Sequence, residues 1–158
     1  MCASVNDCAA RPIPLAEGRI LLIYAWIMLG SALGGSARYF ISGLVATQIG
    51  ETFPWGTLLI NVTGSFVIGF FATLTGPDGR VFVGTEIRQF VMVGLCGGYT
   101  TFSSFSLQTL NLVRDGEMLR AGGNIGLSVV LCLVAVWLGH VGALQLNLQL
   151  NQLQEARP

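Results

Sequence analysis

Three sets of polar residues at helical spacing are the part of this sequence that could do chemistry. In the first set, Thr57, Asn61 and Ser65 recur every four residues, so a helix would place them on one face. Asn61 is the strongest hydrogen-bonding group of the three, because its carboxamide offers two donors and an acceptor. In an apolar setting such a residue either joins two helices or lines a polar path. For Asn61 this stripe alone leaves both interpretations open.

The second set combines aromatic rings with hydroxyl groups. Phe102, Phe105, Ser106 and Thr109 follow the spacing i, i+3, i+4, i+7, which again places them on one helical face. The edge of an aromatic ring is electropositive, so rings presented edge-on can attract a small anion. The alternative is that the two phenylalanines contact lipid or the protein core, which is the more common role of such rings.

A third stripe consists of Asn124, Ser128 and Cys132, again four residues apart. Gly122 and Gly126 lie on a neighbouring stripe and would allow another helix to approach closely. The third stripe is therefore either a packing seam or a continuation of a polar track.

The elements that carry these stripes are expected to span a membrane. Only 10% of the 158 residues are charged, against about 25% in soluble domains, and the mean hydropathy is +0.68. Four stretches without a charged residue are each about long enough to cross the ~30 Å hydrocarbon layer. These stretches are 20–37, 52–77, 89–113 and 121–154.

The sequence therefore predicts an all-α membrane protein with four transmembrane helices. Their expected ranges are about 20–45, 55–74, 89–113 and 121–144. Together they form a transmembrane domain over 20–144, with an N-terminal tail (1–19) and a C-terminal tail (145–158) that we expect to be weakly ordered. In the first span, Gly30 and Gly34 form the kind of small-residue face that lets helix backbones approach in lipid.

The third span contains an unusual run of poor helix formers. Gly97-Gly98-Tyr99-Thr100-Thr101 follows Gly94, and each Gly weakens a helix by about 1 kcal/mol relative to Ala. We therefore expect the third helix to be broken near Gly97–Thr101.

Several classes of function are excluded by this composition. Four spans use about 80 residues, which leaves short loops and no soluble catalytic domain, so an enzyme is not expected. The net charge is zero and there is no basic run, so a nucleic-acid partner is not expected. The four cysteines, Cys2, Cys8, Cys96 and Cys132, lack metal-ligand spacing.

The arginines give only a weak signal for membrane orientation. If both termini and the 75–88 loop share one side, that side holds five arginines and the other holds three. Such a small bias is equally compatible with one orientation and with insertion in both. The first group is Arg11, Arg19, Arg80, Arg88 and Arg157, and the second is Arg38, Arg114 and Arg120.

Arg38 is the only charged residue embedded near a span. An arginine in this position usually extends to the interface, but it could also raise the local anion concentration at a vestibule. We assign no role to His140, near the end of the fourth span. None of the four stretches contains Asp, Glu or Lys, which counts against a proton-coupled exporter because such proteins generally need an intramembrane titratable group.

Three sequence blocks resemble the Fluc/CrcB family of fluoride channels. They are GGSARY at 34–39, PWGTLLINVTGS at 54–65 and GLCGGYTTFSSFS at 94–106. The resemblance covers about residues 20–143, in order and at matching spacing. The third block is highly specific and the second nearly so.

The resemblance implies an antiparallel, dual-topology homodimer with two fluoride pathways and a structural sodium ion at the dimer centre. By position in the motifs, the sodium ion would be held by the backbone carbonyls of Gly97 and Thr100. The pathway would be lined by Asn61, Phe102, Phe105, Ser106, Thr109 and Ser128, with Arg38 at the vestibule. Gln108, where some relatives carry Glu, and Cys132, where a hydroxyl is common, depart from the family pattern and leave the extent of the polar track open.

The function implied by the resemblance is passive export of cytoplasmic fluoride across a prokaryotic plasma (inner) membrane, giving fluoride resistance. The expected partners are fluoride, a second copy of the chain and membrane lipid. The main alternative is a dual-topology small multidrug-type transporter, which has a similar size and span count. A third possibility, a structural subunit, would explain the small-residue faces but not the Gly-Gly-Tyr-Thr-Thr-Phe sequence.

Overall fold

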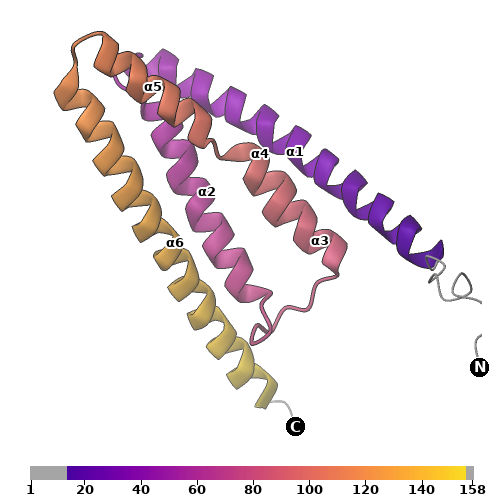
Figure 1. Ribbon diagram of the computed structural model, residues 1–158. Coiled ribbons are helices and arrows are strands. Elements are labelled where there is room, and N and C mark those ends of the chain that lie inside the picture. Colours follow the sequence, from indigo (N-terminus) through magenta and orange to yellow (C-terminus); the bar gives the residue numbers. More distant parts are fainter. Residues whose placement is uncertain (1–13, 156–158) are drawn as a thin grey trace, which may run out of the picture.

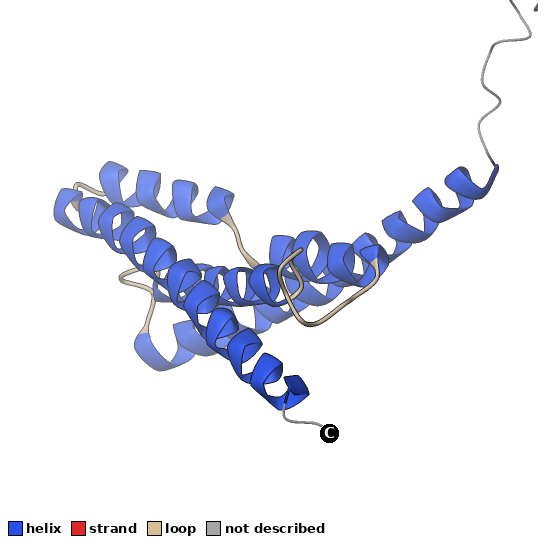
Figure 2. Cartoon of the chain, turned by 90° about the horizontal axis from the view of Figure 1, so that it is seen from below, coloured by secondary structure: helices blue, strands red, loops and turns tan. Residues whose placement is uncertain are grey.

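The computed structural model describes residues 14–155, and all regular structure in this range is helical (Figures 1 and 2). The two long helices, α1 and α6, diverge from each other, and the shorter segments lie between them (Figure 1). The elements are α1 (Pro14–Ile49), α2 (Trp55–Leu74), α3 (Thr85–Gln89), the π-helix η2 (Phe90–Cys96), α4 (Gly97–Tyr99), α5 (Phe102–Arg114) and α6 (Met118–Glu155).

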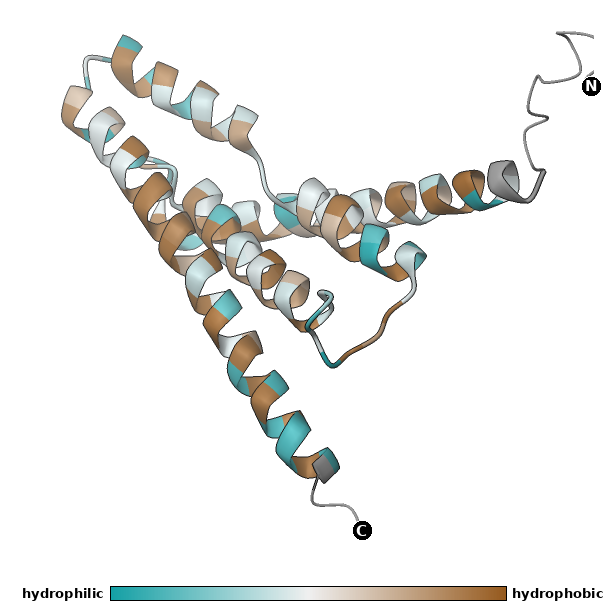
Figure 3. Cartoon of the chain, turned by 60° about the horizontal axis from the view of Figure 1, so that its bottom comes forward, coloured by the Kyte–Doolittle hydropathy of each residue, from teal (hydrophilic) through white to brown (hydrophobic). Residues whose placement is uncertain are grey.

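Four segments of the described chain are long and apolar enough to cross a membrane. They are Gly18–Ile49, Trp55–Leu74, Thr85–Arg114 and Met118–Gln154. This confirms the prediction of an all-helical protein with four membrane-spanning helices. Large apolar side chains are exposed along them, including Leu21 at 69% and Phe40 at 64%. Hydrophobic residues dominate the helices, while the end of α6 mixes hydrophilic with hydrophobic residues (Figure 3).

The second span has the predicted bounds because a proline stands just before it and a Gly-Pro turn follows it. Pro54 has no backbone N–H and stands before the first residue of α2, where that N–H would have no helical partner. The helix ends where the Thr75 N–H bonds to the Phe71 carbonyl and Gly76 and Pro77 follow. Proline cannot continue the helical hydrogen-bond ladder, so the chain turns there.

The predicted weak order of the C-terminal tail is wrong for residues 145–155. This segment continues α6 without interruption, because Leu and Gln are good helix formers and no Gly or Pro follows Gly142 before Glu155. Asn147 also anchors it, since its buried Oδ1 accepts a hydrogen bond from the Arg80 N–H at 3.1 Å.

The first span is also longer than predicted. Helix α1 begins at Pro14, inside the predicted N-terminal tail, and ends at Ile49, where Gly50 adopts a φ of +87°. Only glycine adopts this conformation readily, so the turn into α2 falls there. The remaining tail residues, 1–13 and 156–158, with Cys2, Cys8, Arg11 and Arg157 among them, lie outside the described residues.

Close backbone approach joins α1 to the η2–α4 segment. A Cβ atom on Gly30 would lie 2.9 Å from the Cα of Gly94, and one on Gly98 would lie 2.9 Å from the Cα of Ser31. Real Cβ atoms do not come so close, so glycine is required on both sides of this contact. The small-residue face predicted for the first span is therefore a helix–helix contact within the protomer.

The path of the third span changes direction at two threonines. Helix α4 ends at Tyr99, Thr100 and Thr101 are extended (φ −77°, ψ 156° and φ −152°, ψ 110°), and α5 begins at Phe102. Gly97 lies within α4, next to the π-helical segment.

Candidate functional site

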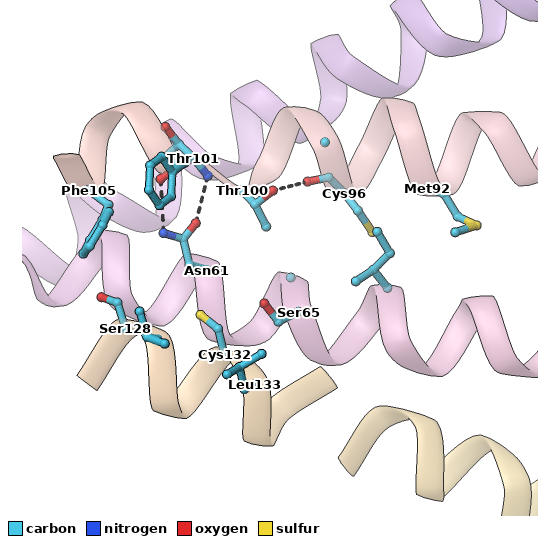
Figure 4. A pocket seen from close by; sticks show the side chains of 15 residues that line it. Asn61, Ser65, Met92, Cys96, Thr100, Thr101, Phe105, Ser128, Cys132 and Leu133 are labelled. Atoms are coloured by element: carbon cyan, nitrogen blue, oxygen red, sulfur yellow. Dashed lines mark hydrogen bonds between the residues drawn. The ribbon is translucent and has the colours of Figure 1, made fainter. Parts of the chain in front are cut away.

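One side chain on α2 binds the backbone of the extended segment. The Asn61 amide Nδ2 donates to the Thr101 carbonyl at 3.1 Å, and Asn61 Oδ1 accepts from the Thr101 N–H at 2.8 Å (Figure 4). Both backbone polar groups of Thr101 are thus satisfied by a residue 40 positions earlier. An extended segment buried among apolar helices needs such partners, because water is not there to supply them.

The Thr101 side chain caps the next helix. Its Oγ1 accepts a hydrogen bond from the Ser104 N–H at 3.2 Å, the usual geometry of a threonine N-cap. In a continuous helix the Thr101 and Ser104 N–H groups would bond to the carbonyls of Gly97 and Thr100, four residues earlier. They donate to side chains instead, so these two carbonyls lack their regular helical partners.

A cavity of about 420 Å³ lies beside this segment, between α2, the third span and α6 (Figure 4). It is lined by Asn61, Gly64, Ser65, Ile68, Met92, Cys96, Gly97, Thr100, Thr101, Phe102, Phe105, Ser128, Val129, Cys132 and Leu133. These lining residues include no Asp, Glu, Lys, Arg or His. The walls are mostly apolar, and the polar groups are amide, hydroxyl, thiol and backbone groups.

The cavity brings together six of the predicted site residues. These are Asn61, Phe102, Phe105 and Ser128 from the predicted pathway, and Gly97 and Thr100 from the predicted ion site. Cys132, one of the two departures from the family pattern, lines it as well. Three predicted residues, Ser106, Thr109 and Arg38, do not line this cavity.

The two phenylalanines contact each other but differ in environment. Their ring centroids are 5.2 Å apart at an interplanar angle of 48°. Phe105 is buried at 9% exposure, whereas Phe102 is 78% exposed in the protomer. Phe105 thus packs within the protomer, and the Phe102 ring is available to lipid or to another chain.

A chain of hydrogen bonds joins α5 to α6 next to the cavity. The Ser128 hydroxyl donates to Asn124 Oδ1 at 3.4 Å, and Asn124 Nδ2 donates to Thr109 Oγ1 at 2.8 Å. The Thr109 hydroxyl in turn donates to the Phe105 carbonyl at 2.8 Å. Asn124 is 1% exposed and is absent from the predicted site; its four-residue spacing from Ser128 was the signal that could have included it.

The remaining two predicted residues lie away from the cavity lining. The Ser106 hydroxyl donates to the Phe102 carbonyl at 2.9 Å and is exposed. Arg38 is half-buried on α1, and its guanidinium forms no ion pair within the described part of the chain. His140 lies on α6, and its Nδ1 is 2.8 Å from the Thr73 hydroxyl, so it joins α6 to α2.

A second, polar cavity of about 340 Å³ lies at the turn between α1 and α2. Thr57 and Gln108 line it together with two carboxylates, Glu51 and Asp115. Because Thr57 lines this cavity and Asn61 lines the first one, the polar stripe of α2 runs from one cavity to the other.

Side chains offer no metal centre in the described range. No group of three or more His, Cys, Asp or Glu residues is close enough to hold an ion there. Backbone carbonyls offer oxygen atoms instead, and those of Gly97, Gly98, Tyr99 and Thr100 all lack the helical hydrogen bond from the residue four positions later.

Comparison with known proteins gives a consistent result. Residues 25–140 match the family described as CrcB-like protein, Camphor Resistance (CrcB). A protein of Methylocella silvestris named "Fluoride-specific ion channel FluC" is 70% identical over 124 residues, which cover 78% of this chain and 95% of the relative. A protein of the same name from Opitutus terrae is 66% identical over 125 residues, which cover 79% of this chain and 95% of the relative. Another, from Rhodospirillum rubrum, is 63% identical over 126 residues, which cover 80% of this chain and 98% of the relative.

Proposed function

The chain belongs to the CrcB family, and from this premise we propose that it is a fluoride-selective ion channel. It carries fluoride passively down its electrochemical gradient, out of the cytoplasm, and so gives fluoride resistance. Its four membrane-spanning helices and its family make it a multi-pass membrane protein. We assign it to the plasma (inner) membrane of a prokaryote.

The observation that carries this proposal is the composition of the 420 Å³ cavity between the helices. Fluoride is small and strongly hydrated, so a selective path must replace its water shell with hydrogen-bond donors. Asn61 and Ser128 supply amide and hydroxyl groups, and the edges of Phe102 and Phe105 supply electropositive C–H groups. The lining has no acidic residue to repel an anion.

Asn61 has a donor left for this task. Its Nδ2 carries two hydrogens, and one of them is engaged by the Thr101 carbonyl. The two interpretations of Asn61 therefore do not compete, because the same side chain can fix the extended segment and present an N–H to the cavity.

The proposed assembly is an antiparallel homodimer of dual topology. One protomer leaves Phe102 78% exposed beside the cavity, and a second copy can cover this surface and complete the wall. Two inverted copies would form two pathways. The weak arginine bias of the sequence is compatible with insertion in both orientations.

The residues around the extended segment fit a sodium ion bound at the dimer centre. The carbonyls of Gly97 and Thr100 lack their helical partners, because the Thr101 and Ser104 N–H groups bond to side chains. Carbonyl oxygens suit a hard cation, and irregular backbone at membrane depth is tolerated where protein surrounds it. When bound, the ion supplies fixed positive charge and holds the two chains together.

A membrane potential is sufficient to drive export. A negative interior favours the exit of an anion by about 2.3 kcal/mol per 100 mV. No proton coupling is needed, and the cavity offers no carboxylate or histidine for it. The small multidrug-type transporter is therefore not favoured.

Flux from liposomes tests the proposal. Purified protein is reconstituted into liposomes loaded with potassium fluoride or potassium chloride, a potassium ionophore is added, and the released halide is followed with an electrode. We expect rapid release of fluoride and no release of chloride above that of empty liposomes. Absence of fluoride release, or equal release of both halides, would reject the proposal.

A further inference from the structure

The hydroxyl groups expected to face fluoride have their hydrogens engaged inside the protomer. A hydroxyl has one hydrogen to donate. That of Ser106 goes to the Phe102 carbonyl, and that of Thr109 goes to the Phe105 carbonyl. Both are the i−4 bonds that serine and threonine make to their own helix, so neither group offers a free donor in this arrangement.

Ser128 differs in the acceptor that it uses. Its hydrogen goes to the side chain of Asn124 rather than to a backbone carbonyl, and the distance of 3.4 Å is longer than the 2.8 Å and 2.9 Å of the other two. A hydrogen bond of this length is weak. Because Ser128 lines the cavity, its hydroxyl is the one of these three that can turn toward an anion at least cost.

The orientation of the Asn124 amide is fixed by its contact with Thr109. The Thr109 hydroxyl donates its one hydrogen to the Phe105 carbonyl, so it can only accept a hydrogen bond from Asn124. The Asn124 atom that lies 2.8 Å from Thr109 Oγ1 must therefore be the amide nitrogen. The carboxamide oxygen therefore faces Ser128. A flipped amide would set its oxygen against the lone pairs of Thr109.

We propose that Asn124 is a positioning residue for fluoride conduction. It donates a hydrogen bond to Thr109, and it accepts the hydrogen bond of the Ser128 hydroxyl until an anion in the cavity accepts that hydrogen bond instead. This inference rests on the proposed function. Asn124 does not line the cavity and is 1% exposed, so it acts through Ser128 and does not itself touch the ion. Asn124 thereby sets the donor-to-acceptor direction of the hydrogen bonds that lead from Ser128 through Asn124 and Thr109 to the Phe105 carbonyl.

Substitution with a residue of similar size tests the role. Asn124→Leu removes the acceptor for the Ser128 hydroxyl and the donor to Thr109, and it places an apolar side chain in the same space. We expect fluoride flux to fall by about tenfold, the factor expected from the loss of about one hydrogen bond's contribution, and fluoride-over-chloride selectivity to fall with it. Asn124→Leu should cause little further loss in the Ser128→Ala background, because Asn124 acts on the ion only through Ser128.

Asn147→Leu is the matched control. Asn147 is another buried asparagine on α6, but its Oδ1 bonds to the Arg80 N–H in the loop and it lies outside the cavity lining. Its substitution should leave selectivity unchanged. If Asn124→Leu does not yield folded protein, Thr109→Val removes the acceptor of Asn124 without touching Asn124 and should lower flux and selectivity in the same direction.

The outcomes separate this inference from the proposed function. Wild-type protein that releases no fluoride would overturn the proposed function, and the inference with it. Wild-type protein that conducts, beside a folded Asn124→Leu variant with unchanged flux and selectivity, would overturn the inference alone. It would also be overturned if the effects of Asn124→Leu and Ser128→Ala multiplied as independent changes.

Discussion

At the scale of single residues, the central contact is the pair of hydrogen bonds between Asn61 and the backbone of Thr101. The extended segment at Thr100 and Thr101 depends on them, because a polar backbone inside apolar helices needs internal partners. The same residues line the cavity. Structure and proposed function therefore share one contact.

Replacing Asn61 should lower both the stability of the protein and its fluoride flux. Asn61→Leu leaves the N–H and C=O of Thr101 without their partners, and each unsatisfied buried group costs about 1–3 kcal/mol. We expect unfolding of the purified protein at lower temperature or denaturant concentration, together with loss of fluoride flux. Val67→Ala, an exposed change on the same helix, is the control; equal stability of both variants would contradict the role of Asn61.

The phenylalanine pair gives a second prediction at this scale. Phe102→Ile and Phe105→Ile remove an electropositive ring edge while keeping an apolar side chain. Each should lower fluoride flux in liposomes by about tenfold, as expected if the rings replace part of the hydration shell of the ion. Phe82, which is 91% exposed in the loop before α3, provides the control Phe82→Ile. If both test variants form the proposed dimer and their flux is unchanged, the two rings do not contribute to the fluoride pathway.

Much of this site could be predicted from residue types and spacing, but its hydrogen bonds could not. The four-residue stripes group Asn61 with Ser65 and Ser128 with Cys132, and all four line one cavity. For Asn124 the spacing predicts only a packing seam or a polar track, because its two partners come from tertiary contact with α5 and from its own helix. Spacing along one helix does not report which groups a neighbouring helix presents.

At the scale of elements, the spans follow from the absence of charge, whereas their ends depend on local signals. Pro54 and the Gly76-Pro77 turn mark both ends of α2, so its bounds could be predicted. The end of α6 carries no such signal. We expected a weakly ordered tail there, but helix propensity and the Asn147–Arg80 contact extend the helix to Glu155.

The contact of α1 with η2 gives a prediction for glycine substitutions. A Cβ on Gly30 would lie 2.9 Å from the Cα of Gly94, while a Cβ on Gly43, also on α1, would meet nothing within 4 Å. Gly30→Ala should therefore destabilise the protein by about 1–3 kcal/mol through overpacking. Gly43→Ala should be neutral or stabilising by up to about 1 kcal/mol, since Ala favours the helix.

Denaturant unfolding in detergent compares the two glycine variants. The same change at two positions of one helix separates local crowding from the effect of alanine itself. If Gly30→Ala were as stable as Gly43→Ala, the close approach of α1 and η2 would not hold.

At the scale of the whole molecule, the protomer is splayed and exposes much of its apolar surface. Helices α1 and α6 diverge (Figure 1), and side chains such as Phe102 and Leu133 are exposed at the cavity that they line. Lipid can cover most of this surface. A second, inverted copy would close the cavity and is the assembly that we propose.

The proposed dual topology predicts that the same loop residue lies on one side of the membrane in some chains and on the other side in the rest. The four native cysteines are replaced by serine, and Phe82→Cys is introduced in the exposed loop before α3. An impermeant maleimide added to intact cells should label about half of the chains, as expected when arginine bias does not fix one orientation. Labelling of nearly all or nearly none of them would indicate a single orientation.

Passive conduction of fluoride is tested by the reversal potential of the current that the protein carries in planar bilayers. With a fluoride gradient and equal chloride on both sides, we expect a current that reverses at the fluoride equilibrium potential. An imposed pH gradient should not move that potential, because the cavity lining contains no acidic or histidine side chain to couple protons to the ion. A reversal potential that follows the proton gradient, or one set by chloride, would show that the protein is not a passive fluoride channel.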